Sequence, residues 1–250
     1  MIEVQKISKT FADKQVLNKV SYTIEQGLTN LVIGQSGSGK SVFLKSVVGL
    51  HGVDSGHILY NGRDITQMKP KALKKLRQEI GMVFQGGALF NSSTVEENVR
   101  YPLDMFTNMS KAEKQNRIDF CLDHVQLEKA NHLFPSEISG GMQKRVAIAR
   151  AIALNPKYLF CDEPNSGLDP VTAIVIDQLI QDLTKEFDIT TMIITHDMNS
   201  VMEIGEKIMY VYQGQKWWEG NKDEIFNTEN PELNNFVFAS DLFKAVKKNK

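Results

Sequence analysis

Short apolar runs alternate with amphipathic stretches along most of the 250-residue chain. Seven of these runs are short and rich in β-branched or aromatic residues, which predicts strands. They cover residues 3–6, 31–33, 58–60, 82–84, 158–161, 191–195 and 208–212. Strands that alternate with helices favour a mainly parallel sheet that is covered by helices. The pattern therefore predicts an α/β protein.

The pattern changes between about residues 94 and 153, where helical spacing dominates and strand signals are few. Ser110 and Glu113 form a capping box, which predicts the start of one helix. Residues 142–153 predict a second helix, and Pro156 lies just beyond its end. We therefore expect a helical insert within a sheet-based core.

A further helix is predicted to begin at Asp169 and Pro170, because this pair is an N-cap followed by proline in the first turn. Beyond this start, apolar residues recur every four positions and predict the face that packs on the core. The set consists of Val171, Val175, Leu179 and Leu183, widened by Ile174 and Ile180.

Composition and charge exclude several classes of protein. Apolar residues make up 42% of the chain and charged residues 24%, which is typical of a globular protein. The net charge of −1 supplies no basic field for nucleic acid, and no apolar run is long enough to cross a bilayer. The first ten residues lack the layout of a signal peptide, and the two cysteines are not in a metal-binding spacing. We expect a cytoplasmic protein that binds no nucleic acid.

Residues 34–41 match the phosphate-binding P-loop pattern of glycine, four residues, then Gly-Lys-Ser. The motif follows an apolar strand and precedes a helical run, which is the context that the pattern requires. Backbone N–H groups of such a loop form an anion nest at a helix N-terminus. Lys40 can reach the β- and γ-phosphates, and Ser41 can ligate Mg²⁺. The predicted nucleotide-binding residues are Gly34, Gln35, Ser36, Gly37, Ser38, Gly39, Lys40 and Ser41.

Two carboxylates follow the apolar run at residues 158–161. A parallel sheet would deliver Asp162 and Glu163 to the edge where phosphates bind. Asp162 is placed to hold Mg²⁺ through water, and Glu163 is placed to polarise an attacking water. Taken alone, the pair is equally well explained as a solvated strand end. Beside a P-loop, the catalytic interpretation is favoured.

Four further motifs complete an order that resembles the ATPases of the ABC transporter family. They are Gln85 after the strand at 82–84, Ser139-Gly140-Gly141-Met142 at a helix start, Ser166-Gly167-Leu168-Asp169 after the carboxylates, and His196 after the strand at 191–195. The resemblance covers nearly the whole chain. It implies a P-loop NTPase fold with a mainly parallel sheet core, an antiparallel β part and an inserted helical subdomain.

The resemblance also implies how the chain is divided. Residues 1–250 would form a single ATPase domain. The core would consist of residues 1–85 and 156–230, the helical subdomain of about residues 86–155, and the C-terminal tail of residues 231–250.

The family implies catalysis by Glu163, His196 and Gln85. Glu163 would act on the attacking water, and His196 would contact the γ-phosphate and help orient that water. Gln85 would sense Mg²⁺ and the γ-phosphate, and would couple to a membrane partner. The implied Mg²⁺ ligands are Ser41, Gln85 and Asp162.

The family further implies a head-to-tail dimer with two shared ATP sites. Ser139, Gly140 and Gly141 would close over ATP bound to a second copy of the chain. Asp169 would lie at the dimer interface. Phe11 matches the aromatic residue that stacks on adenine, and ordinary packing at a strand end is the alternative.

Met142 departs from the family's usual signature, which has glutamine at this position. Together with residues 84–90 and 149–154, the signature resembles the ATPases of Mla-type phospholipid transporters, which work with Mce-domain lipid-binding proteins. This implies hydrolysis of ATP with Mg²⁺ that powers phospholipid transport through an integral membrane permease, at the inner face of the cell membrane. Another cargo, such as an amino acid or a lipoprotein, and a soluble ATPase for iron–sulfur assembly are the alternatives.

The C-terminal tail has apolar residues at helical spacing, flanked by lysines. The apolar residues are Ala239, Leu242, Phe243 and Val246. Docking on the partner ATPase, contact with anionic lipid headgroups and packing on its own domain are all compatible with this pattern.

Overall fold

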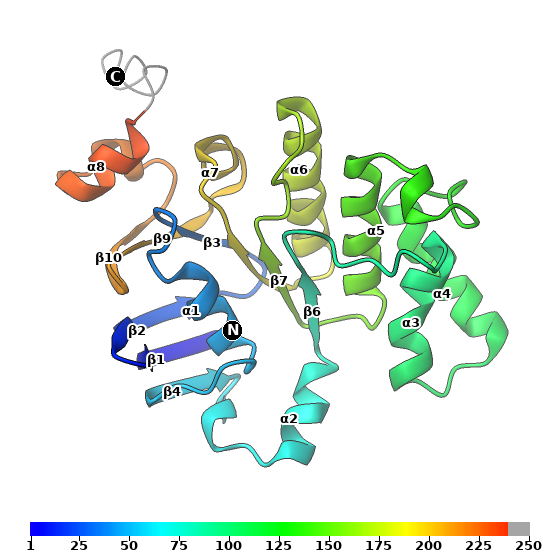
Figure 1. The fold of residues 1–250 in the computed structure, drawn as a ribbon, viewed down its shortest axis with the longest axis horizontal. Coiled ribbons are helices and arrows are strands. Elements are labelled where there is room, and N and C mark those ends of the chain that lie inside the picture. The colour runs from blue at the N-terminus through cyan, green and yellow to red at the C-terminus, as the bar shows by residue number, and fades with distance from the viewer. Residues whose placement is uncertain (240–250) are drawn as a thin grey trace.

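Two β-sheets and the helices packed on them make up residues 1–239, the part of the chain that the computed structural model describes (Figure 1). The larger sheet has six strands in the order β10-β9-β3-β8-β7-β6. Its strands are β3 (Thr29–Ile33), β6 (Ile80–Val83), β7 (Tyr158–Asp162), β8 (Thr190–Ile194), β9 (Lys207–Tyr212) and β10 (Gln215–Gly220). All neighbours are parallel except β10, which runs antiparallel to β9.

The smaller sheet is antiparallel and has the order β2-β1-β4-β5. Its strands are β1 (Ile2–Phe11), β2 (Lys14–Ile24), β4 (Ser55–Tyr60) and β5 (Arg63–Asp64). This sheet and the first helix pack on one face of the larger sheet, where Val32 of β3 is buried. Leu31 and Ile33 are buried on the other face, among the remaining helices. A strand that is buried on both faces reads as an unbroken apolar run, as β3 does.

Eight α-helices cover the described sheets. They are α1 (Lys40–Val47), α2 (Pro70–Arg77), α3 (Val95–Phe106), α4 (Lys111–His124), α5 (Gly140–Ile152), α6 (Pro170–Glu186), α7 (Met198–Ile204) and α8 (Pro231–Val237). Short 3₁₀ turns occur at Ile65–Gln67, Pro135–Glu137 and Ile225–Asn227. Figure 1 shows α3 and α4 at the end of the molecule farthest from β1 and β2. Between β6 and β7 the chain is helical and contributes no strand.

The predicted fold class is confirmed, and all seven predicted strands overlap observed ones. The capping box of Ser110 and Glu113 also forms, with Ser110 Oγ accepting from Glu113 N at 3.3 Å. Strand β2 was not predicted, because its buried residues are not evenly spaced. Leu17 and Val20 are both buried, although they are three residues apart, because Lys19 between them has a φ of +49° at an irregularity in the pairing.

The predicted apolar face of α6 is wrong in its first turns. Val171, Ile174 and Val175 are 73%, 44% and 39% exposed. The buried face is formed by Ala173, Ile176, Asp177, Ile180, Gln181, Leu183 and Thr184. A row of residues spaced by four drifts around the helix by about 40° per step, so it cannot stay on one face. The buried set alternates steps of three and four and includes polar residues that an apolar pattern overlooks.

Residues 240–250, which hold most of the predicted amphipathic tail, lie outside the described residues. Within residues 1–239, no helix combines the length and the apolar character needed to cross a membrane.

Candidate functional site

The P-loop connects the carboxyl end of β3 to the N-terminus of α1. Gly34 and Gly39 have φ values of +151° and +108°, in the region that favours glycine. A Cβ atom would lie 2.3 Å from the Val211 carbonyl oxygen at Gly34, and 2.9 Å from the Val16 carbonyl oxygen at Gly39. No side chain caps α1, so its first amides are left to bind an anion.

Lys40 is buried at the base of this loop. Its Nζ donates to the carbonyl oxygens of Gly34 at 2.7 Å and Gln35 at 3.0 Å. Burial lowers the pKa of Lys40, and the nearby carboxylates of Asp162 and Glu163 oppose that lowering. A cation is therefore held beside the loop amides, where a phosphate chain would need it.

Two P-loop hydroxyls face different surroundings. Ser41, the second residue of α1, is exposed at the mouth of the loop. Ser38 Oγ is buried and has no hydrogen-bond partner within residues 1–239. A buried polar atom without a partner is costly, and a phosphate oxygen seated in the loop is a partner that would satisfy it.

The three predicted catalytic residues meet at the carboxyl edge of the large sheet. Glu163 directly follows β7 and its backbone N–H donates to the Ile194 carbonyl oxygen of β8 at 2.9 Å. Its Oε1 lies 2.9 Å from His196 Nδ1, and its Oε2 accepts from Gln85 Nε2 at 2.8 Å. Asp162 lies next to Glu163, opposite Ile194 in the strand register. Parallel strands bring residues from three loops to one place.

The charges of this cluster depend on one another. Burial raises the pKa of Asp162, and the charge of Glu163 raises it further, whereas Lys45 and Lys40 lower it. A half-buried carboxylate that resists ionisation beside a second carboxylate is a natural place for a divalent cation, because the charge of the cation relieves the repulsion.

The residues at this edge fit Mg²⁺ in its usual protein setting. Among residues 1–239, no three His, Cys, Asp or Glu side chains gather to form a complete metal cage. Mg²⁺ is usually bound by one or two carboxylates, with waters and substrate phosphates filling the rest of its shell. The Asp162 carboxylate, the Ser41 hydroxyl and the amide oxygen of Gln85 supply oxygen donors of that partial kind.

Lys144 is a site residue that the sequence analysis missed. It lies on α5, it is buried, and its Nζ donates to the carbonyl oxygen of Gln85. Burial lowers its pKa and the charge of Glu163 opposes this. A lysine among the apolar residues of a helix was the available signal, but its partner lies 59 positions away in the sequence.

The predicted signature residues lie apart from the P-loop of their own chain. Ser139 caps α5, with its Oγ accepting from Met142 N at 3.3 Å. In Figure 1, β7 and β6 lie between α1 and α5. Asp169 caps α6 by accepting from Thr172 N at 3.0 Å. A Cβ on Gly141 would lie 2.7 Å from Thr172 Cγ2, so the N-termini of α5 and α6 pack against each other.

Phe11 lies at the exposed end of β1. Its ring meets His51 edge-on at a centroid distance of 5.4 Å, and Lys9 Nζ lies 5.3 Å from its centroid. The following strand β2 places the Val16 carbonyl oxygen against Gly39 of the P-loop. The ring is 41% exposed, and its contacts with His51 and Lys9 are of the kind that packing at a strand end also makes.

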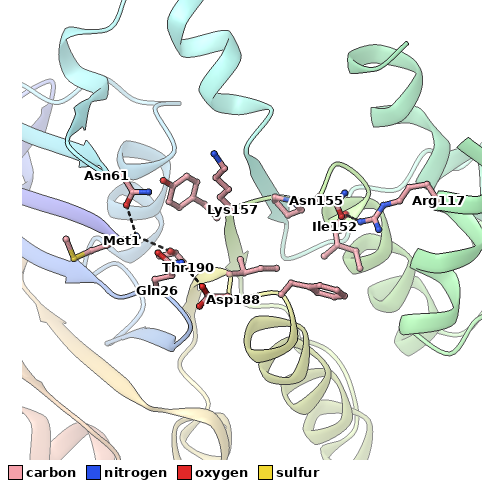
Figure 2. A pocket seen from close by; sticks show the side chains of 13 residues that line it. Met1, Gln26, Asn61, Arg117, Ile152, Asn155, Lys157, Asp188 and Thr190 are labelled. Atoms are coloured by element: carbon pink, nitrogen blue, oxygen red, sulfur yellow. Dashed lines mark hydrogen bonds between the residues drawn. The ribbon is translucent and has the colours of Figure 1, made fainter. Parts of the chain in front are cut away.

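Two cavities differ in where they lie on the large sheet. A groove of about 1070 Å³ at the carboxyl edge is lined by Gln35, Glu163 and His196, together with parts of α6, α7 and α8. A cavity of about 400 Å³ lies at the opposite edge, between Met1, Arg117 and Thr190 (Figure 2). Ligands of α/β sheets bind outside the carboxyl ends of the strands, so the groove belongs to the functional site.

The fold and this edge define the class of protein: a P-loop nucleoside triphosphatase. Residues 17–166 match the family model described as ABC transporter. The chain is 36% identical over 236 residues to the probable ribonucleotide transport ATP-binding protein mkl of Mycobacterium bovis, covering 94% of this chain and 66% of that protein. It is 39% identical over 231 residues to the methionine import ATP-binding protein MetN 1 of Staphylococcus aureus, covering 91% of this chain and 67% of that protein.

Solved structures agree with these sequence matches. The ATP-binding cassette MJ0796, in a dimeric post-hydrolysis state bound to ADP and Pi, has a TM-score of 0.80 at 34% identity, covering 89% of this chain and 99% of that one. CbiO1 of Clostridium perfringens, part of the ABC transporter complex cbiONQ, has a TM-score of 0.85 at 27% identity, covering 98% of both chains.

The chain belongs to the ABC transporter family and carries its ATPase cassette, which uses ATP and Mg²⁺. This confirms the family that the order of motifs predicted. The chain spans 66% of the length of the mycobacterial relative.

Proposed function

We propose that this chain is the ATP-hydrolysing subunit of a transporter, and that Glu163 is its catalytic base. The observation that carries the proposal is the position of Glu163, whose two carboxylate oxygens are held by His196 and Gln85 beside the P-loop. Lys40 and the loop amides would bind the phosphates of ATP. Asp162, Ser41 and Gln85 would hold Mg²⁺, which supplies positive charge to the developing phosphate oxyanions. Glu163 would accept the proton of the attacking water while His196 keeps that carboxylate oriented.

The second half of each ATP site would come from another copy of the chain. Ser139, Gly140 and Gly141 begin α5, and the first amides of such a helix attract anions. Ser139 and Gly140 are exposed, and in Figure 1 strands β7 and β6 separate their helix α5 from α1, the helix that follows the P-loop. A head-to-tail dimer would use this N-terminus to close the partner's site, with Asp169 at the interface. The dimeric state of the related cassette MJ0796 supports this arrangement.

An integral membrane permease would dock beside Gln85. The loop after Gln85 leads to Phe90, which is 42% exposed and packs on Tyr101 at a centroid distance of 4.8 Å. Arg150 of α5 donates to the carbonyl oxygens of Gly87 at 2.7 Å and Ala88 at 2.8 Å. An exposed aromatic pair formed by a loop residue and a residue of α3 is a suitable anchor for a partner, because the loop itself is held to α5. The chain would then lie in the cytoplasm at the inner face of the membrane.

Phospholipid is the cargo that we propose, with an Mce-domain lipid-binding protein as a further partner. The support is Met142 in the signature and the motifs at residues 84–90 and 149–154, which resemble Mla-type ATPases. The related proteins are named for ribonucleotide and methionine transport, so another transported molecule is the competing hypothesis. The permease complex in vesicles decides between them: phospholipid would stimulate ATP hydrolysis, whereas methionine would not.

Phe90→Asp tests the coupling surface. We expect the variant to hydrolyse ATP alone at the wild-type rate but to lose co-purification with its permease, because a charge replaces the exposed aromatic ring. Phe187→Asp is the matched control, since Phe187 is also a surface phenylalanine, 38% exposed. Transport and permease binding by Phe90→Asp at wild-type levels would contradict the proposed docking surface.

A further inference from the structure

A buried polar cluster connects the two loops that carry Glu163 and His196. Its members are Asn165 after β7, Asp177 on α6 and Ser200 on α7, and all three are buried. Asn165 Nδ2 donates to Asp177 Oδ2 at 3.0 Å and to Ser200 Oγ at 2.8 Å. Three segments that are distant in the sequence therefore meet at one side-chain amide.

The cluster lies where α6 departs from an apolar pattern. Asp177 is 2% exposed and shares the buried face with Ile176 and Ile180. Its Oδ1 has no hydrogen-bond partner within residues 1–239. Burying a polar group without a partner costs folding free energy, so stability alone does not account for an aspartate here. Departures from local patterning of this kind are typical of functional positions.

The electrostatics of Asp177 also indicate that this residue does not serve stability alone. Burial raises the pKa of Asp177 to about 6, with Asp197 and Glu203 raising it further and hydrogen bonds from Ser200 and Asn165 lowering it. On β7, Asp177 in turn contributes to the raised pKa of the buried Cys161. The pKa of Asp177 lies above the ordinary 3.8, so the folded state favours its neutral form. Folding stability from this group therefore falls as the pH rises from about 4 to about 6.

The geometry shows which arrangement of catalytic loops the buried Asp177 can maintain, despite its cost in folding free energy. Asn165 lies two residues after Glu163, and Ser200 lies four residues after His196. In the interior, the Asn165–Ser200 hydrogen bond joins the loop after β7 to the first turn of α7, which directly follows the His196 loop, while Glu163 Oε1 lies 2.9 Å from His196 Nδ1. Asp177 fixes the orientation of the Asn165 amide from the side of α6. The separation of Glu163 and His196 is thus set by two contacts: the one between their own side chains, and the buried hydrogen bond between Asn165 and Ser200.

We propose that Asp177 is a positioning residue for ATP hydrolysis, which acts with Asn165 and Ser200 to hold the loops of Glu163 and His196 in register. The inference rests on the proposed roles of Glu163 and His196. The cluster would affect the chemical step. It would not affect nucleotide binding, because the P-loop lies on a different segment, between β3 and α1.

Asp177→Asn separates this role from a structural one. We expect kcat for ATP at pH 7.5 to fall about tenfold, because small displacements of catalytic groups are costly. KM should stay within about twofold, since no P-loop contact changes. The melting temperature should stay equal or rise at pH 7.5, because a buried charge is removed. Its change between pH 7.5 and pH 5.5 should also be smaller than in the wild type.

Thr184→Val is the matched control on the same helix. Thr184 is buried, and its hydroxyl donates to the Ile180 carbonyl oxygen at 2.7 Å and lies 2.7 Å from Thr191 Oγ1, at the end of β8 opposite to the His196 loop. We expect this variant to melt at a lower temperature with an unchanged kcat. A loss of melting temperature in Asp177→Asn that matches the control, with no loss of kcat, would overturn the inference.

Ser200→Ala provides a second measurement, which decides the matter if Asp177→Asn does not fold. We expect kcat to fall several-fold with KM unchanged, and wild-type kcat in Ser200→Ala would then reject the positioning role. Glu163→Gln keeps this failure distinct from that of the proposed function. Inactive Glu163→Gln beside a fully active Asp177→Asn rejects the inference alone, whereas an active Glu163→Gln rejects the catalytic assignment.

Discussion

The N-termini of α1 and α5 each have a glycine at or next to their first residue and both offer backbone amides to an anion, but they differ in what surrounds them. Around α1 the loop glycines, Lys40 and the Asp162–Glu163 pair gather in one place. Around α5 the cap is Ser139 alone, which accepts from its own helix at Met142. The first gathers the residues predicted to bind phosphate and to catalyse, and the second is a capped helix end without them. The difference supports the proposal that the α5 end serves the ATP site of another copy.

The largest effect is expected at the α1 end, in Glu163→Gln. Turnover should fall by about 1,000-fold, because the amide cannot accept the proton from water. ATP binding should persist, and the ATP-loaded variant should elute as a dimer in size-exclusion chromatography. A monomer that stays monomeric with saturating ATP would contradict the idea that the α5 end completes a neighbour's site.

A smaller effect is expected for Lys40→Ala. Removing the buried ammonium should weaken ATP binding by about 10- to 100-fold, the range for a hydrogen bond to a charged group. Titration of the purified chain with a fluorescent ATP analogue measures this. Unchanged affinity would show that the loop amides suffice without the lysine.

The smallest effect is expected at the α5 end, in Ser139→Ala. Turnover by the dimer should fall several-fold, while ATP affinity measured on dilute monomer stays the same, because the serine serves the other copy. Ser110→Ala is a matched control, since Ser110 caps α4 with the same 3.3 Å contact that Ser139 makes at α5. Equal losses of turnover in the two variants would mean that only helix capping is affected.

The same contrast explains which parts of the site the sequence could predict. The P-loop is local: its glycines, Lys40 and the flanking strand and helix are contiguous, so spacing alone defines them. Glu163 was predicted because it follows a strand whose carboxyl end lies at the phosphate-binding edge, whereas Gln85 and His196 were predicted from the resemblance to the ABC family. Roles assigned to Ser139, Asp169 and Phe11 depend on a second chain or a nucleotide, and they stay predictions.

Other features could not be predicted because their partners are distant in the sequence. The role of Lys144 is recognised only from its contact with the carbonyl oxygen of Gln85, and that of Asn165 only from its contacts with Asp177 and Ser200. A search for apolar faces passes over Asp177, since it treats a polar residue on a helix as exposed. In β2, the bulge at Lys19 removes the alternation by which a strand is recognised.

The contacts of α5 have a mechanical consequence. Lys144 of α5 donates a hydrogen bond to the loop at Gln85, and Arg150 of the same helix donates hydrogen bonds to it at Gly87 and Ala88. The helix has 13 residues and so forms a rod of about 20 Å, with Ser139 at its tip. We expect a displacement of the loop after Gln85 to move α5 as one unit, because hydrogen bonds hold the loop to the helix at two points. Force applied at the surface would thus arrive at Ser139 as a change of angle.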